Sequence, residues 1–147
     1  MTNQFIGSWK LITSEFRDSN ETVIYPFGKD AIGMLIYDQD EQMSVHLMRV
    51  DRPKFLSGDL QRGTSDEIKT AFEGFLSYFG TFRVSEADGT VTHHLDGCSF
   101  PNWVGGDQKR FFKFSGNRLT LSTPPTLING VSIIGYLIWE RTSQAVQ

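Results

Sequence analysis

Residues 81–95 read TFRVSEADGTVTHHL, and this stretch decides the class of fold. Thr81–Ser85 and Thr90–Leu95 each have the length and the β-branched content of a strand. Between them lies Asp88-Gly89, which is typical of a tight hairpin because glycine accepts the positive φ that such a turn requires. The stretch therefore predicts two antiparallel strands joined by a short turn.

The same pattern recurs towards the C-terminus. Asp107–Phe114 and Arg118–Thr123 flank Gly116-Asn117, which predicts a second hairpin. Asn129-Gly130 then opens a final strand over Val131–Arg141. The residues after it, 143–147, are expected to form a frayed tail.

Four further extended segments precede the first hairpin. They are predicted at Gly7–Phe16, Thr22–Tyr25, Ile32–Tyr37 and Met43–Val50. Strict alternation in the first segment places Phe16 on the face opposite Trp9 and Leu11. The third segment is apolar on both faces, which predicts a strand that is covered on both sides.

One segment departs from the two-residue period of a strand. From Thr64 onward, apolar side chains recur with the spacing of one helical face, which predicts an α-helix near residues 64–78. Thr64 and Glu67 have the spacing of a capping box, in which each side chain accepts from an otherwise unpaired backbone amide. The apolar face is expected to pack against a barrel, and it consists of Ile68, Ala71, Phe72, Phe75, Leu76 and Phe79.

About nine strands and a single helix favour an all-β fold, namely a closed antiparallel β-barrel of about 8–10 strands with one flanking helix. The 147 residues are expected to form one domain, 1–147, with 39% hydrophobic and 13% aromatic residues. A chain of this length builds its core without the help of a disulfide or a metal.

Charge and cysteine content exclude several classes of protein. The 14 basic and 17 acidic residues give a net charge of -3, which argues against a nucleic acid partner. The one cysteine, Cys98, cannot form an intramolecular disulfide. No secretory signal and no stretch of about 18 apolar residues is present, so we expect a cytoplasmic protein without a membrane partner.

The first and the last predicted strands each carry a tryptophan motif. Gly7-Ser8-Trp9 opens the first strand, and Trp139-Glu140-Arg141 closes the last. This pair of motifs resembles the lipocalin-type barrel, in which the tryptophan of the first strand packs at the base against an arginine of the last strand, a cation–π contact of about 0.5–2 kcal/mol. The resemblance implies that Trp9 and Arg141 form the structural base.

The rest of the chain resembles one group of such proteins more closely. The matching segments are residues 33–37, 42–44, 47–49, 75–81, 91–94, 100–105 with Gln108 and Arg110, and 116–121. This series is similar to the family of lipocalin-like domain proteins of bacteria and fungi. The resemblance implies a small antiparallel barrel that encloses a ligand cavity, and some fungal members lie beside secondary-metabolite genes.

Two neighbouring histidines and one arginine are the candidates for chemistry. His93 and His94 are adjacent in a strand, so they point to opposite faces and only one of them can line a cavity. That histidine is a candidate general base or hydrogen-bond donor to a ligand. Arg110 shares a strand face with Phe112 and Phe114, which favours an inward position.

A buried Arg110 would need a partner, either a ligand carboxylate or a protein carboxylate such as Glu15 or Glu140. The other ligand-binding candidates are aromatic, methionine or histidine side chains of the expected barrel wall or rim. They are Tyr37, His46, Met48, Trp103, Phe112 and Tyr136. Trp103 either covers the cavity as a lid or plugs one end of the barrel.

Neither a metal nor a cofactor is expected. His46, His94 and Asp96 lack the spacing of a metal site, and the chain contains no phosphate loop and no dinucleotide-binding motif.

Two functions fit these residues. The first hypothesis is the binding of a small, largely apolar molecule, anchored at its polar end by Arg110 and a histidine. The alternative is a cofactor-free isomerase, cyclase or dehydratase for a polyketide- or terpenoid-like molecule, with His93 or His94 moving a proton and Arg110 or Tyr37 stabilising an oxyanion. A barrel filled by its own side chains, with an interaction role, is a third possibility.

Overall fold

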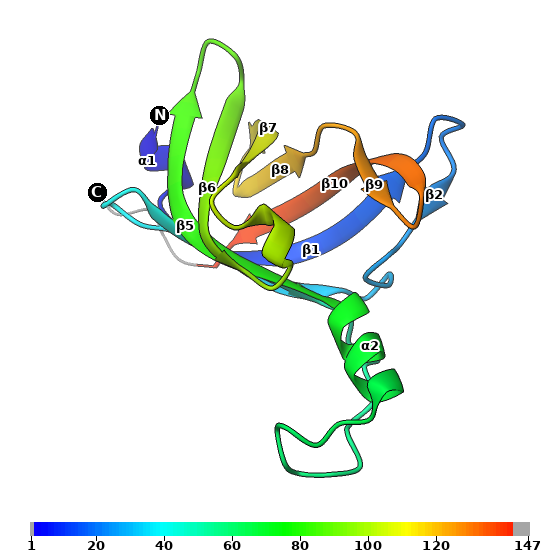
Figure 1. The fold of residues 1–147 in the computed structure, drawn as a ribbon. Helices are drawn as coiled ribbons and strands as arrows, with labels where there is room; N and C mark the ends of the chain where they lie inside the picture. Colours follow the sequence, from blue (N-terminus) through cyan, green and yellow to red (C-terminus); the bar gives the residue numbers. More distant parts are fainter. Residues whose placement is uncertain (1, 143–147) are drawn as a thin grey trace.

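The computed structural model describes residues 2–142, and the predicted tail at 143–147 lies outside them. These residues form a ten-stranded antiparallel sheet that closes on itself (Figure 1). The strands are β1 Gly7–Arg17, β2 Val23–Ile24, β3 Ile32–Tyr37, β4 Gln42–Met48, β5 Phe75–Ser85, β6 Thr90–Cys98, β7 Asp107–Ser115, β8 Arg118–Ser122, β9 Thr126–Ile128 and β10 Val131–Arg141. The helices are α1 Thr2–Phe5, α2 Ser65–Glu73 and the short 3-10 helix η1 Pro101–Trp103.

Eight of the strands form the barrel. They follow one another in the order β1-β3-β4-β5-β6-β7-β8-β10, and pairing of β10 with β1 closes the ring. The short strands β2 and β9 extend from β1 and β10 at one end. The predicted all-β fold, a closed antiparallel barrel, is therefore confirmed.

The three predicted turns form as expected. Gly89 and Gly116 have φ values of 66° and 59° in the β5–β6 and β7–β8 hairpins. Asn129 and Gly130, at 54° and 78°, join β9 to β10. These residues accept the left-handed conformation at little steric cost, so they place the hairpins.

Helix α1, which was not predicted from the sequence, provides Phe5, the residue that closes the barrel base. Phe5 is fully buried, and its ring packs edge-on against Tyr37, Phe112 and Phe114 with centroids 4.9–5.4 Å apart. The indole N–H of Trp9 donates to the carbonyl of Phe5 over 2.9 Å. Edge-on aromatic contacts of this kind add to the stability gained by burial, so one end of the barrel is closed by rings.

Arg141 holds α1 against this base. Its guanidinium carbon lies 4.2 Å from the centroid of the Trp9 ring. The same group donates to the carbonyl of Ile6 over 2.7 Å and to the carbonyl of Gln4. The structure thus places the start of β1 beside the end of β10, as the lipocalin-type pattern implies.

A β-bulge in β1 corrects one prediction. The pairing with β10 shifts by one residue between Leu11 and Thr13. As a result, Phe16 is buried on the same face as Trp9 and Leu11, not on the opposite face. An extra residue in one strand reverses the alternation beyond it, which the sequence pattern alone does not reveal.

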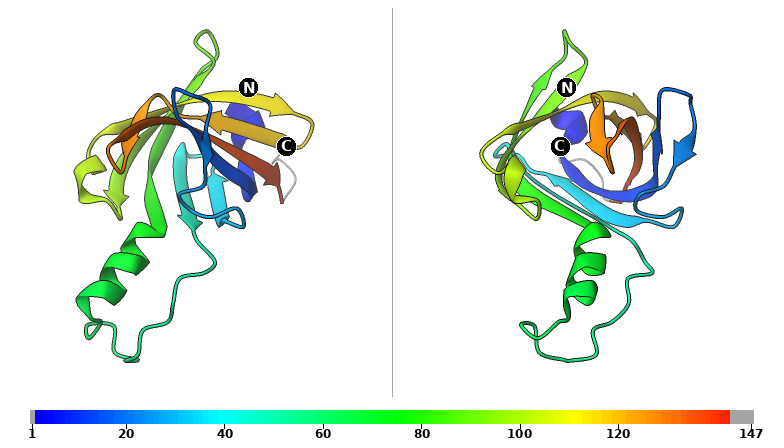
Figure 2. Two further views of the ribbon diagram at one scale, coloured as in Figure 1. Left: turned by 90° about the vertical axis from the view of Figure 1, so that its right-hand side faces the viewer. Right: turned by 45° about the vertical axis from the view of Figure 1, so that its right-hand side comes forward.

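The predicted helix is correct at its start and wrong at its end. Thr64 and Glu67 form the capping box as expected. Helix α2 ends at Glu73, however, and the apolar stretch from Phe75 belongs to β5, where it pairs with β4. The helix also stands away from the barrel (Figures 1 and 2), and none of its residues is buried. The expected helix-to-barrel packing is therefore wrong.

Strand β3 also differs from its prediction. Leu35 and Tyr37 are buried, whereas Ile32 and Met34 on the outer face are half exposed. The strand is covered on its inner face only, because α2 does not lie over it.

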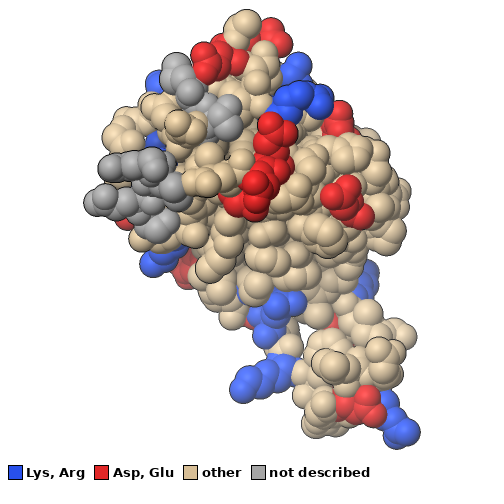
Figure 3. Space-filling view, turned by 90° about the vertical axis from the view of Figure 1, so that its left-hand side faces the viewer, with Lys and Arg blue, Asp and Glu red and all other residues tan. Residues whose placement is uncertain are grey.

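The outer surface carries mixed charge. On the face shown in Figure 3, acidic and basic side chains lie near one another and much of the surface is uncharged. Among residues 2–142, no helix has the length and hydropathy needed to cross a membrane.

Candidate functional site

A cavity of about 280 Å³ occupies the barrel between its aromatic base and its open end. Aliphatic side chains and one indole form most of its wall, namely Leu35, Val45, Leu47, Leu121, Leu137 and Trp139. Four parts of the chain surround the mouth of the cavity: the segment from the end of β1 to the loop after β2, the end of α2, η1, and β9. The residues of the mouth include Phe16, Phe27, Phe72, Phe100, Trp103 and Ile128. The site is therefore an apolar chamber with an aromatic rim, as small-molecule sites commonly are.

Three polar side chains from neighbouring strands meet in this chamber. Tyr78 of β5, His93 of β6 and Arg110 of β7 all line the cavity. The Tyr78 hydroxyl lies 2.7 Å from Nδ1 of His93. Behind them, the hydroxyl of Tyr37 lies 2.6 Å from Nε2 of His93. Both ring nitrogens of His93 are therefore engaged by tyrosine hydroxyls.

His93 is an uncharged imidazole at neutral pH. Burial in the barrel, together with the positive charge of Arg110, lowers its pKa from 6.5 to about 3. A neutral imidazole has one N–H and one lone pair, so His93 donates to one tyrosine and accepts from the other.

Both tyrosines keep their protons as well. Burial raises the pKa of Tyr37 well above its ordinary value. Burial also raises the pKa of Tyr78, although the charge of Arg110 acts in the opposite direction. The polar group of the cavity thus consists of two neutral phenols, a neutral imidazole and one guanidinium cation.

Arg110 is buried without a counter-charge. It is 9% exposed, and its Nη1 donates to the carbonyl of Lys109 over 3.0 Å and to Oε1 of Gln108 over 3.5 Å. Within residues 2–142 it forms no ion pair with a carboxylate. A buried cation without a carboxylate is costly, and Arg110 lines a cavity with room for a ligand.

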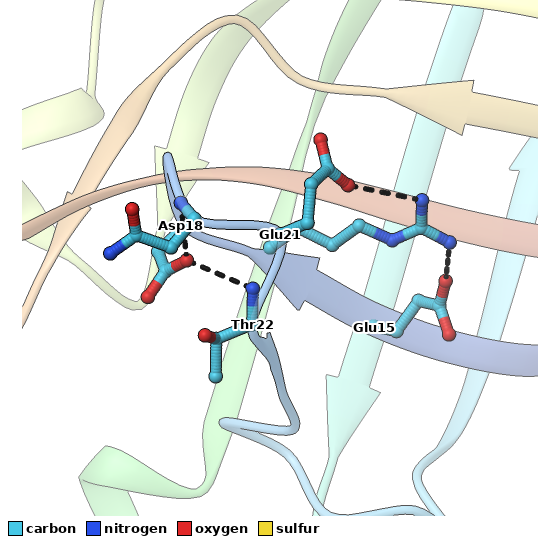
Figure 4. Close-up of polar contacts among 6 residues, drawn as sticks. Glu15, Asp18, Glu21 and Thr22 are labelled. Atoms are coloured by element: carbon cyan, nitrogen blue, oxygen red, sulfur yellow. Dashed lines mark hydrogen bonds and ion pairs between the residues drawn. The ribbon is translucent and has the colours of Figure 1, made fainter.

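Neither of the two predicted protein partners pairs with Arg110. Glu15 accepts from Arg17 over 2.6 Å at the β1–β2 turn, where Glu21 lies 3.7 Å from the same guanidinium (Figure 4). Glu140 pairs with Arg118 over 3.4 Å. Both carboxylates belong to surface ion pairs, so the structural-carboxylate alternative for Arg110 is wrong.

Comparison with known proteins identifies the family to which this barrel belongs. The family model described as "Lipocalin-like domain" matches residues 6–142. The chain belongs to the lipocalin-like domain family. In this lipocalin-like protein, the match extends over all eight strands of the barrel.

Two known proteins resemble this lipocalin-like protein. The 4'-hydroxy-3'-methoxypropiophenone carrier protein ppsC of Aspergillus oryzae is 32% identical over 106 residues, which span 67% of this chain and 96% of that protein. Among solved structures, the REP1-NXSQ fatty acid transporter has a TM-score of 0.42 and 11% identity, with 95% of this chain and 96% of that chain covered.

Of the residues predicted from the sequence, three line the cavity of the lipocalin-like protein, and two lie deeper. His93, Arg110 and Trp103 are in the lining. Trp103 is at the mouth, where its ring packs edge-on against Phe100. Tyr37 and Phe112 point inwards but belong to the layer between the cavity and Phe5. Tyr37 therefore reaches the site through His93, not by lining it.

Four predicted site residues lie on the outside of the barrel. His94 forms a 2.8 Å contact with Asp107, and Nδ1 of His46 lies 2.8 Å from the Ser77 hydroxyl. The reason is the two-residue alternation of a strand: His93 is buried, so His94 points outwards.

The same alternation places Met48 and Tyr136 outside. Val45 and Leu47 are buried on β4, so His46 and Met48 face away from the cavity. On β10 the buried residues are the odd-numbered Ile133 and Trp139, and Tyr136 lies beneath the guanidinium of Arg17 at 5.0 Å.

Tyr78 lines the cavity beside His93 and was not predicted from the sequence. The apolar spacing from Ile68 to Phe79 indicated a helix, and a helix would have given Tyr78 no fixed place in a barrel wall. The β-rich stretch Phe75–Phe79, with tyrosine in its middle, carried the signal for a strand.

No metal site accompanies this polar group in the part of the chain that the structure describes. Residues 2–142 hold no convergent group of three His, Cys, Asp or Glu side chains that could bind a metal ion. The polar side chains that Tyr78, His93 and Arg110 bring to the cavity offer hydrogen bonds and one positive charge.

Proposed function

We propose that this lipocalin-like protein is a carrier that binds a small, largely apolar molecule with its polar end on Arg110. The observation that carries the proposal is the buried guanidinium, which forms no ion pair with a carboxylate within residues 2–142 and lies in the wall of a mostly apolar cavity. A ligand that brings an oxygen to Arg110 would compensate this charge and bury its own apolar part among the aliphatic walls.

The size of the cavity supports a ligand of about one substituted ring. An apolar cavity of about 150 Å³ holds benzene, so about 280 Å³ has room for a ring with short substituents. The related carrier protein ppsC is named for 4'-hydroxy-3'-methoxypropiophenone, a molecule of this kind. This supports an aromatic ketone or a similar compound as the ligand class.

The enzymatic alternative has less support. His94 is outside the cavity, and His93, with a pKa of about 3, is a weak base at neutral pH. His93 is therefore better suited to holding a hydrogen-bond pattern than to moving a proton. A cytoplasmic location and a single-domain protein stay predictions from the sequence.

Binding of 4'-hydroxy-3'-methoxypropiophenone to the purified protein tests the carrier proposal. The change is Arg110→Met, which keeps an unbranched side chain and removes the cation. We expect about 10–100-fold weaker binding by isothermal titration calorimetry, because a hydrogen bond to a charged group is lost. We also expect the ligand-free variant to be as stable as the wild type or more stable, since the unpaired buried charge is gone.

Arg118→Met is the matched control, because Arg118 lies on the outer surface in a pair with Glu140. This variant should bind as the wild type does. Equal affinity of Arg110→Met and wild type, or no binding of any small aromatic ketone to the wild type, would count against the proposed function.

A further inference from the structure

The hydroxyl of Tyr37 is the starting point, because it is buried and has a single partner. Tyr37 is 1% exposed and does not line the cavity. Within residues 2–142, its hydroxyl makes one hydrogen bond, with Nε2 of His93 at 2.6 Å. Phe5 and Phe82 cover the ring, and neither offers an acceptor.

The proton of Tyr37 therefore goes to His93. If Nε2 carried the imidazole proton and donated it to Tyr37, the phenol's own proton would be buried without an acceptor. A buried unsatisfied donor is costly and rare, whereas an unused lone pair on the phenol oxygen is tolerated. Tyr37 thus donates to Nε2, and the single N–H of the neutral His93 is on Nδ1.

This choice fixes the direction of the next hydrogen bond. Nδ1–H of His93 donates to the Tyr78 oxygen, which lies 2.7 Å away. Tyr78 then accepts from His93 and has its own proton free. Arg110 cannot accept it, because a guanidinium has donors only. The hydroxyl proton of Tyr78 is left to point into the cavity that Tyr78 lines.

We infer that the Tyr37–His93–Tyr78 chain makes the polar end of the cavity a donor-only subsite, which selects a ligand with an acceptor oxygen. The two donors are the Tyr78 hydroxyl and the Arg110 guanidinium. The ligand class is a ketone, carboxylate or phenolate, and an ammonium or a pure hydrocarbon is disfavoured. This inference rests on the proposed carrier function and adds the chemistry that the ligand must present.

Tyr37 is a positioning residue in this scheme. It does not line the cavity, yet its proton sets the tautomer of His93 and thereby the direction of the Tyr78 hydroxyl. Burial of the polar group and the nearby Arg110 keep His93 uncharged, so the pattern holds at neutral pH.

The tautomer itself is measurable without a ligand. Nitrogen-15 NMR of the imidazole, through long-range couplings to the ring protons, distinguishes a protonated Nδ1 from a protonated Nε2. We expect the Nδ1–H form for His93 in the full-length protein. A protonated Nε2 would overturn the inference, whatever the protein binds.

Three probes of nearly equal size test the ligand class. Propiophenone offers an acceptor oxygen, propylbenzene offers neither donor nor acceptor, and 1-phenylpropan-1-amine carries an ammonium. We expect propiophenone to bind at least about tenfold tighter than propylbenzene, with the amine the weakest of the three.

The outcomes separate the two proposals. Binding of propylbenzene or of the amine as tight as that of propiophenone would overturn the donor-only subsite and leave the carrier function standing. If none of the three probes binds, the carrier function fails, and the ligand class fails with it, even where NMR shows the Nδ1–H form.

Tyr37→Phe tests the positioning role. Without its donor, Nε2 no longer holds the tautomer, so the preference for propiophenone over propylbenzene should fall by about threefold or more, with propylbenzene affinity nearly unchanged. Tyr25→Phe is the matched control, because the Tyr25 ring packs under Lys29 and does not line the cavity. An unchanged preference in folded Tyr37→Phe would overturn the role of Tyr37.

Discussion

Burial in one barrel wall makes His93 a neutral imidazole and leaves Arg110 as a cation with little access to water. Each would be an ordinary surface side chain elsewhere, but three adjacent strands place them with Tyr78 in the same chamber. The cation and the loss of water both disfavour a second charge, so the imidazole stays neutral. In the proposed scheme, a neutral histidine between two phenols transmits a hydrogen-bond direction from Tyr37 to Tyr78.

The depressed pKa of His93 predicts a loss of stability in acid. The pKa is about 3 in the folded protein and 6.5 ordinarily, so between these values the unfolded chain binds a proton that the folded protein excludes. Stability contributed by the neutral imidazole is present above pH 6.5 and is lost as the pH falls towards 3. The loss amounts to about 5 kcal/mol at most, on top of what the carboxylates contribute.

Urea unfolding of wild type and His93→Gln at pH 7, 6, 5 and 4 measures this effect. The glutamine variant does not titrate, so its unfolding free energy should fall less steeply with acid than that of the wild type. Parallel slopes for wild type and His93→Gln would show that burial of this imidazole does not depress its pKa.

At the scale of single elements, the β5–β6 hairpin combines a predictable turn with an unpredictable bulge. Asp88-Gly89 predicts the turn from the sequence, and the structure confirms it. The register shift between Phe79 and Gly80 has no comparable signal. It brings the backbone of β6 so close that a Cβ at Gly80 would overlap the carbonyl oxygen of His94.

Gly80→Ala should therefore destabilise the protein by about 3 kcal/mol, because backbone atoms must move to admit the methyl group. Gly97→Ala is the control: its methyl group would meet the ring of Phe79, which is half exposed and free to rotate away. That variant should lose less than about 1 kcal/mol in urea unfolding. Equal losses for the two variants would contradict the close approach of the strands.

Helix α2 shows why period alone misleads. Ile68 and Phe72 continue into Phe75 and Phe79 with helical spacing, yet the helix stops at Glu73 because the residues from Phe75 gain a full set of pairings with β4. Sheet formation over a long strand outweighs local helical preference. The capping box was predictable because both of its partners are local.

At the scale of the whole molecule, the barrel has a closed base and an open mouth. The base joins residues from both ends of the chain: Phe5, Trp9 and Arg141. Because Arg141 bonds two carbonyls near α1 and stacks on Trp9, it secures the plug over the barrel end. The mouth is built mostly from loops, from α2 and η1 and from the short strand β9, which lie outside the eight barrel strands. It is therefore the end through which a ligand passes in the carrier proposal.

Arg141→Lys should lower the unfolding free energy by about 1–3 kcal/mol, since lysine keeps the charge but loses the planar fork that reaches both carbonyls. Arg118→Lys, in an exposed pair with Glu140, should change it by less than about 0.5 kcal/mol. Chemical denaturation of the three proteins measures both effects. An unchanged unfolding free energy in Arg141→Lys would show that α1 closes the base without the guanidinium.

The sequence by itself determined the all-β class, the two hairpin turns, the turn that opens the last strand and the start of the helix, because each depends on residues close together in the chain. It also carried Gly7-Ser8-Trp9 and Trp139-Glu140-Arg141, whose resemblance to the lipocalin type pointed to barrel closure. Strand alternation made it certain that His93 and His94 point to opposite faces, but not which of them points inwards.

Only the tertiary structure decided that point and the composition of the site. The bulges in β1 and β5, the end of α2 and the insertion of Phe5 all depend on pairing and packing between distant segments. These contacts bring Tyr37, Tyr78, His93 and Arg110 together from four strands. The absence of a carboxylate beside Arg110, within residues 2–142, is likewise a property of the folded barrel, because Glu15 and Glu140 pair on its outer surface.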